Sequence, residues 1–187
     1  IYATVEKVAR ALPPETTFLG FAGSLGYLDA DFLKYETFVA GTGTVDVAEF
    51  RRVQNTPKWT ASGTLDYMTP LGDGRLNINS TLSYRSKTYQ FEIPVPQFDQ
   101  DSYALLDANI VWRSAGNRYF VGLHGKNLTN KRYATSGYNF LRVDPITGAF
   151  ILPNGQPGIS SPLGKEGVLT AFYGNPRQVF VSLGVNF

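Results

Sequence analysis

From Gln178 to Phe187 polar and apolar side chains alternate except at Phe180, and the run ends on an aromatic residue. Successive side chains of a β-strand point to opposite faces, so Val181, Leu183, Val185 and Phe187 share one face while Ser182 lies on the other. A strand of a soluble β-sandwich has the same period, but it seldom ends a chain on an outward aromatic side chain. This ending predicts a strand with one face in an apolar environment and the other in water.

The same alternation predicts about seven strands, at residues 3–12, 18–31, 57–69, 74–89, 102–114, 117–128 and 175–187. The clearest is 74–89, where every second residue from Arg75 to Lys87 is polar, which excludes a dry core on that face. In 18–31, Phe18 and Leu28 interrupt the polar face, so the sequence leaves open which alternate residues of this strand lie on the apolar face. We expect an all-β fold of antiparallel strands.

Composition excludes several other classes. No stretch of about 20 apolar residues is present, which excludes a transmembrane helix but not membrane strands, whose polar face lowers any average hydropathy. The net charge of +2 is spread along the chain and gives no nucleic-acid footprint. Cysteine is absent and His124 is the single histidine, so disulfides, thiolate sites and two-histidine metal sites are excluded. We expect no metal, no cofactor and no enzymatic activity.

The connections between the strands are unequal in length. Tight turns are predicted at 13–15, 71–73 and 115–117, whereas 32–56, 90–101 and 129–174 are long. Bacterial outer-membrane barrels have short periplasmic turns and long external loops. Trp59 and Tyr67 lie eight positions apart on one face, which is about 26 Å of strand or roughly 20 Å of membrane depth after tilting. We expect aromatic girdles at the long-loop level (Trp59, Tyr84) and the short-turn level (Tyr67, Trp112, Tyr119, Phe187).

Four segments together suggest a family. GKNLTNKRYAT at 125–135 and FYGNPRQVFVSLGVNF at 172–187 resemble the C-terminal end of TonB-dependent outer-membrane receptors, and SLGYLDADF at 24–32 and PKWTASGTLDYMTPL at 57–71 are similar to other strands of that family. The resemblance covers nearly the whole chain. It implies a transmembrane β-barrel of 22 strands in the bacterial outer membrane of a Gram-negative cell, with an N-terminal plug, importing a scarce nutrient such as a ferric siderophore with energy from TonB.

The chain departs from that family in lacking a plug, a TonB box and room for 22 strands. We therefore expect residues 1–187 to be the C-terminal part of the barrel, with seven to eight strands. Implied partners are outer-membrane lipid, the plug and N-terminal strands of the receptor, TonB, the barrel-assembly machinery and a small-molecule ligand of unknown identity. The alternative is a passive porin-like or small stand-alone barrel with a structural or adhesive role.

Three groups of residues are candidate functional sites. The first would face the lumen, as a path for an anionic substrate or as contacts to an acidic plug: Arg75, Arg85, Lys87, Arg113, Arg118, His124 and Lys126. The second would contact ligand from an external loop: Tyr133, Tyr138, Phe140, Arg142 and Tyr173. The third is implied by the resemblance as the C-terminal assembly signal: Val181, Leu183, Val185 and Phe187. Gly41-Thr42-Gly43 is interpreted as a flexible loop, and Asp99 with Asp101 as a solvated turn rather than a cation site.

Overall fold

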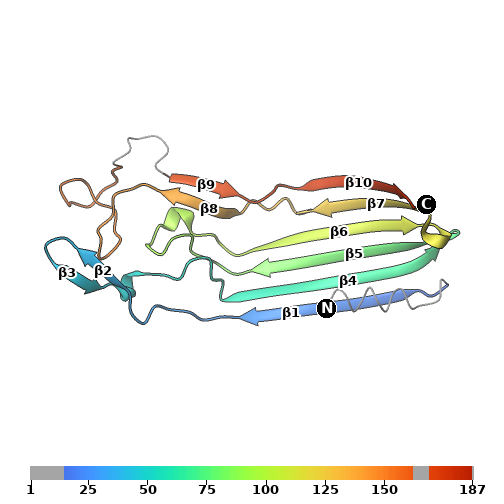
Figure 1. Cartoon of the computed structure of the whole chain (residues 1–187), viewed down its shortest axis with the longest axis horizontal. Helices are drawn as coiled ribbons and strands as arrows, with labels where there is room; N and C mark the ends of the chain where they lie inside the picture. Colours follow the sequence, from blue (N-terminus) through green and yellow to red (C-terminus); the bar gives the residue numbers. More distant parts are fainter. Residues whose placement is uncertain (1–14, 162–168, 187) are drawn as a thin grey trace.

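The fold is a single curved layer of antiparallel strands with an irregular cap at one end. The computed structural model describes residues 15–161 and 169–186. Six strands form the main sheet in the order β1-β4-β5-β6-β7-β10 (Figure 1). They are β1 (Phe18–Tyr27), β4 (Trp59–Leu71), β5 (Gly74–Arg85), β6 (Tyr103–Arg113), β7 (Tyr119–Lys126) and β10 (Gln178–Val185). The all-β, antiparallel expectation is confirmed, and the described strands form no closed barrel.

Two short hairpins belong to the long connections. β2 (Glu36–Val39) pairs with β3 (Gly43–Asp46), and β8 (Ala134–Asn139) pairs with β9 (Leu169–Tyr173). Three single turns of 3-10 helix complete the secondary structure: η1 (Ala48–Phe50), η2 (Pro96–Phe98) and η3 (Ala115–Asn117). Within the described ranges, no helix is long and apolar enough to cross a membrane.

The two ends of the sheet differ in the length of the connections between strands. The turns β4–β5 and β6–β7 are tight because Gly72, Gly116 and Asn117 adopt positive φ angles of 63°, 68° and 58°. The three long connections all lie at the opposite end and form the cap (Figure 1). The predicted turns at 71–73 and 115–117 are therefore confirmed, whereas the strand predicted at 3–12 lies outside the described residues.

The register settles the phase of β1. Ser24 lies opposite Ser62 and Leu25 opposite Ala61, which places Leu25 on the apolar face of the sheet. Phe18 lies on the polar face beside Met68. Leu28 lies beyond the end of β1, where its N–H donates to the carbonyl of Lys58. The two residues that interrupted the sequence pattern therefore lie at the two ends of the strand, where alternation matters least.

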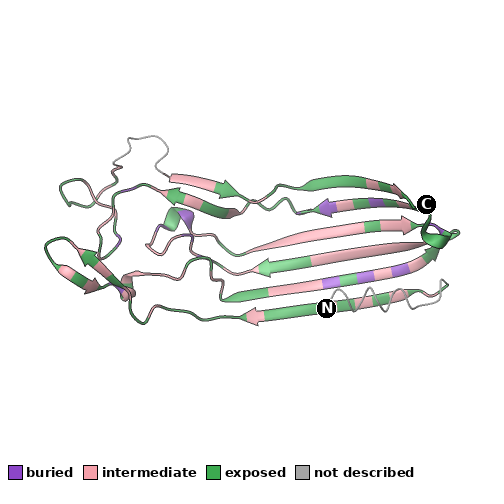
Figure 2. Cartoon of the chain, in the orientation of Figure 1, coloured by how far each residue is buried: buried purple, intermediate pink, exposed green. Residues whose placement is uncertain are grey.

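Burial is sparse in the sheet and concentrated in the cap. β1 and β10 are exposed along most of their length, while buried positions lie mainly on β4 and β7 (Figure 2). Four of the five buried apolar residues belong to the cap: Val47, Val95, Phe98 and Leu141. The sheet thus has no second layer over either face within the described residues.

Candidate functional site

The first face of the sheet is apolar and uncovered. Its central rungs place Leu82 between Gly63 and Leu106, and Ile110 beside Leu123. Large apolar side chains of this face are between 42% and 78% exposed. They are Leu19, Phe21, Leu25, Leu65, Leu71, Leu82, Ile110, Val121, Leu123, Val179, Val181, Leu183 and Val185. Monomeric soluble proteins rarely expose a contiguous apolar surface of this extent, so this face needs an apolar partner.

Aromatic residues stand at both ends of this apolar face. At the cap end, the rings of Tyr27 and Trp59 lie 4.7 Å apart. At the turn end, the indole N–H of Trp112 donates to the carbonyl of Leu71 over 3.0 Å, and Tyr119 lies opposite Val185. Each tryptophan therefore combines an apolar ring surface with a position at the boundary of the apolar face. Phe187, predicted at the turn level, lies outside the described residues.

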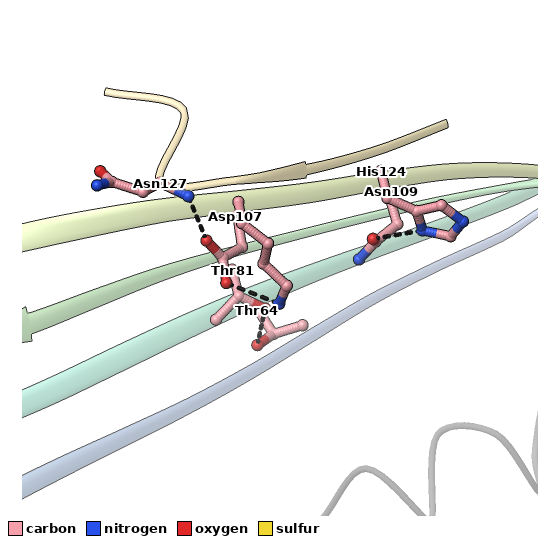
Figure 3. Close-up of polar contacts among 7 residues, drawn as sticks. Thr64, Thr81, Asp107, Asn109, His124 and Asn127 are labelled. Carbon is pink, nitrogen blue, oxygen red and sulfur yellow. Dashed lines mark hydrogen bonds and ion pairs between the residues drawn. The ribbon is translucent and has the colours of Figure 1, made fainter. Parts of the chain in front are cut away.

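The second face carries cross-strand hydrogen bonds between polar side chains (Figure 3). The hydroxyls of Ser24 and Ser62 lie 2.8 Å apart, and those of Thr64 and Thr81 lie 3.0 Å apart. The amide of Asn79 donates to Asp66 over 2.6 Å. Lys126 forms an ion pair with Asp107 at 2.9 Å. These pairs join neighbouring strands through side chains as well as through the backbone.

His124 joins three strands on this polar face. Its Nδ1 lies 2.9 Å from Oδ1 of Asn109 on β6, and its Nε2 lies 2.8 Å from the hydroxyl of Ser182 on β10. The ring also stacks on Phe180 at 4.8 Å. A Cβ at Gly122 would meet Nε2 of His124 at 2.6 Å, so only glycine leaves room for the His124–Ser182 contact. These contacts give the single histidine a structural role between β6, β7 and β10.

The proposed lumen-facing cations do not form one cluster. Register places Arg75, Arg85, Arg113, His124 and Lys126 on the polar face. Lys87 lies in the cap, paired with Asp99 at 3.0 Å. Arg118 follows η3 at the turn end, with its guanidinium 5.5 Å from the ring centre of Tyr119. Because Lys87 and Lys126 are paired with carboxylates, the positive charge free to act on a ligand is smaller than the sequence suggested.

Charged residues hold the three long connections together as one cap. Arg51, from the first connection, donates to the carbonyls of Pro145 and Ile146 in the third, at 2.8 and 3.0 Å. Tyr35 donates to the carboxylate of Glu92 over 3.0 Å, and this hydrogen bond raises the pKa of Tyr35.

A second set of contacts centres on Asp99. It pairs with Arg52 at 3.7 Å as well as with Lys87, and the hydrogen bond and charge of Asp99 raise the pKa of Lys87. Asp99 is therefore a structural anion that links the first two connections, and with a side chain only 11% exposed it is not the solvated turn expected from the sequence. Gly41-Thr42-Gly43 is not a loose loop, because it forms the tight turn of the β2–β3 hairpin, with Thr42 N–H donating to Val39.

The candidate ligand-contact residues of the third connection separate into different surroundings. Tyr138 and Phe140 gather with Phe172 in an exposed aromatic cluster, with ring centres 5.7 to 5.9 Å apart. Tyr133 instead stacks on Tyr103 of β6 at 4.7 Å. The guanidinium of Arg132 lies 4.1 Å from the ring centre of Tyr173. Arg142 is exposed, and its backbone N–H donates to Ser160.

Asn127 is a structural residue that the sequence analysis did not single out. It is 5% exposed, and its side chain bonds the backbone of Lys131 in both directions and the carbonyl of Asn175. Its backbone N–H donates to Asp107, and its φ is 47°. Asparagine tolerates this left-handed conformation better than most residues. An Asn immediately after a strand and within a turn-rich segment was the available signal.

No group of three or more His, Asp or Glu side chains within the described ranges has the arrangement of a metal site.

Comparison with known proteins gives matches over a short part of the chain. No family model matches, and no solved structure matches. A protein of Sphingopyxis alaskensis named uroporphyrinogen decarboxylase is 53% identical over 53 residues, which is 28% of this chain and 14% of that protein. A protein of Rhizorhabdus wittichii with the same name is 52% identical over 52 residues, 28% of this chain and 13% of that protein. The chain thus matches about one seventh of the length of these curated relatives.

The names of these relatives contradict part of what the sequence predicted. Both relatives carry the name of an enzyme and neither is named as a receptor. The identification as a TonB-dependent receptor, siderophore import, the bacterial outer-membrane location and the expectation of no enzymatic activity are therefore wrong, and the porin-like alternative has no support. The physical reason is that alternation and a terminal aromatic residue report an amphipathic strand, not the activity of the protein that contains it. The count of 22 strands depended on the resemblance and is withdrawn with it.

Proposed function

We propose that the sheet is an arc of a β-barrel wall in a lipid bilayer, with its apolar face against acyl chains and its polar face toward water. The observation that carries this proposal is the uncovered apolar face, on which no Asp, Glu, Lys or Arg lies between the Trp59 and Trp112 levels of β4, β5 and β6. Acyl chains remove such a surface from water along its whole length, because the hydrophobic effect is non-directional and needs no shape-matched partner.

The edges of the sheet support the same proposal. Among the described strands, β1 pairs only with β4, and β10 pairs only with β7. An open edge in hydrocarbon leaves backbone N–H and C=O groups unsatisfied, which costs several kcal/mol for each group. Further strands that continue the sheet at both edges and close it remove this cost. The proposed barrel is therefore closed by further strands that pair with the free edges of β1 and β10.

The positions of the aromatic residues support a spanning orientation. Trp59 and Tyr67 are separated by eight residues of β4, which corresponds to about 26 Å along the strand and roughly 20 Å of depth at a tilt near 40°. Trp112 lies at the other end of β6 from the cap. Tryptophan and tyrosine are enriched at the two interfaces of a bilayer. This orientation places the cap on one side of the bilayer and the tight turns on the other.

Depth-dependent fluorescence quenching tests the proposal, because the chain has two tryptophans and both lie on the apolar face. The protein is folded into phosphatidylcholine vesicles whose acyl chains carry bromine at a shallow or a deep position. Trp59 and Trp112 should be quenched most by shallow bromine. With both replaced by Phe, Leu82→Trp should be quenched most by deep bromine, while the polar-face control Asn77→Trp should be affected little. Equal quenching of the Leu82→Trp and Asn77→Trp variants contradicts the proposal.

A second candidate function comes from the names of the relatives. The identity of 53% over 53 residues suggests that the matched stretch contributes to a uroporphyrinogen decarboxylase activity. Incubation of the purified chain with uroporphyrinogen, followed by chromatography of the oxidised porphyrins, tests this candidate. Formation of products with fewer carboxyl groups supports it, and an unchanged substrate rules out that activity for the chain acting alone.

A further inference from the structure

A hollow opens where the polar face of the sheet meets the cap. It has a volume of about 320 Å³ and is lined by Pro57, Thr60, Ser83, Tyr84, Arg85, Tyr103 and Leu105. Thr60 lies opposite Arg85, and Arg85 lies opposite Tyr103, so neighbouring rungs of β4, β5 and β6 contribute to it. Small-molecule sites have volumes from about 300 Å³ upward. The hollow is therefore large enough for a compound with one aromatic ring.

The polar groups of this hollow differ from the rest of the polar face. Ser24, Thr64 and Asp66 bond partners across the strands, but the side chains of Thr60 and Ser83 bond no other described residue. Tyr103 likewise contributes only its ring, which stacks on Tyr133. The hydroxyl groups of Thr60 and Ser83, two residues that line the hollow, have no partner in 15–161 and 169–186 and are therefore available to a ligand.

Arg85 gives the hollow a positive charge. Its Nη2 donates to the carbonyl of Asn55 over 2.8 Å, which fixes the side chain in place. Its Nε is enclosed with no acceptor, and Arg85 forms no ion pair with any carboxylate of the described residues. The carboxylate of Asp99 in the cap is paired with Lys87 and Arg52. A planar guanidinium with spare donors is suited to a carboxylate.

We propose that this hollow binds a small organic monocarboxylate with an apolar body. The carboxylate lies at Arg85 with the hydroxyls of Thr60 and Ser83 beside it, and the apolar body lies against Pro57 and Leu105. This inference goes beyond the lipid-facing role and does not depend on it, because the hollow opens on the opposite face of the sheet.

Binding of 4-hydroxybenzoate to the full chain, measured by calorimetry, tests the proposal, with 4-hydroxybenzamide as the uncharged probe. We expect the carboxylate to bind at least about tenfold more tightly than the amide, and Arg85→Gln to weaken its binding by about tenfold or more, a loss typical of one charge-assisted contact. Arg118→Gln removes a cation at the far end of the sheet and should leave the affinity within about twofold.

Several outcomes overturn the proposal: no binding of 4-hydroxybenzoate to the wild-type chain, equal binding of acid and amide, or equal losses in Arg85→Gln and Arg118→Gln. The last result identifies attraction to overall charge rather than a site. If Arg85→Gln disturbs folding through the lost contact to Asn55, the double variant Thr60→Val/Ser83→Ala replaces it. An unchanged affinity in that double variant then contradicts the proposal.

Discussion

Leu82→Arg is the sharpest test of what contacts the apolar face. Leu82 lies opposite Gly63 on β4, and Gly63 is four residues from Trp59 and four from Tyr67. Its side chain is therefore midway between the two aromatic levels, and it is 51% exposed. No other site of the central strand β5 combines this depth with a large exposed apolar side chain.

The two possible environments predict different magnitudes. In acyl chains, arginine at the mid-depth of a barrel strand costs about 2 to 4 kcal/mol, falling to about 0 to 1 near an interface. This mid-depth cost corresponds to a change of about 30- to 900-fold in the folding equilibrium. In water, a half-exposed surface position changes the free energy of unfolding by about 0.5 kcal/mol or less. The difference between the environments exceeds the error of a chemical denaturation experiment.

The assay is urea titration of the protein folded into vesicles, followed by tryptophan emission. Leu71→Arg is the depth control, since Leu71 lies at the turn end of β4 and is 52% exposed, and it should cost about 0 to 1 kcal/mol. Asn77→Arg on the polar face of the same strand should cost no more than that. If Leu82→Arg loses no more stability than Asn77→Arg, acyl chains do not contact this face.

Three further predictions concern the cap and the turn that leads into it. Asn127→Ala should lower the free energy of unfolding by about 2 to 4 kcal/mol in denaturant titration, because it removes three side-chain hydrogen bonds and places alanine at a φ of 47°. Asn127→Gly loses the same hydrogen bonds but glycine accepts that φ, so this variant should lose less stability. Arg51→Lys should speed proteolysis within residues 144–148, since an ammonium group cannot bond both carbonyls in the geometry of the guanidinium fork; unchanged cleavage contradicts the role of Arg51. Asp46 accepts hydrogen bonds from the backbone N–H groups of Tyr35 and Ala48, and Asp144 accepts chiefly from that of Thr147, so the pKa of each carboxyl is below the ordinary 3.8. The stabilisation from these two carboxylates is therefore complete above about pH 3.8 and is lost as the pH falls through the lowered pKa values. Protection of the cap amides against hydrogen exchange, compared with the intrinsic exchange rate at each pH, should show this loss, and the Asp46→Asn/Asp144→Asn double variant should show a smaller loss over the same pH range.

Periodicity predicted the sheet well because each main strand is amphipathic along its own length. β5 is the clearest example, where the register with β4 and β6 confirms every predicted face from Arg75 to Arg85. Glycine and asparagine in tight turns carry a local signal of their own, so Gly72 and Gly116 were also interpreted correctly.

The cap was not predictable in the same way, because its structure depends on contacts between distant segments. β8 and β9 pair residues that are 30 to 39 positions apart, and Arg51 bonds carbonyls 94 and 95 positions away. The hollow at Arg85 likewise needs residues from three strands and could not be assembled from spacing alone. Short strands such as β2, with four residues, carry too few alternating positions to stand out from a loop.

The shared core of the cap determines where the chain accepts added sequence. Surface loops usually tolerate insertions independently of each other, but Arg51 and Asp99 tie these three connections into one unit. An epitope tag within residues 144–148 displaces the carbonyls that Arg51 binds and therefore disturbs the first connection as well. The turn at Asn154 and Gly155 is exposed and is closed by its own backbone bonds between Leu152 and Gln156. A tag inserted after Asn154 should therefore label the cap side of the molecule while the sheet and the rest of the cap keep their fold.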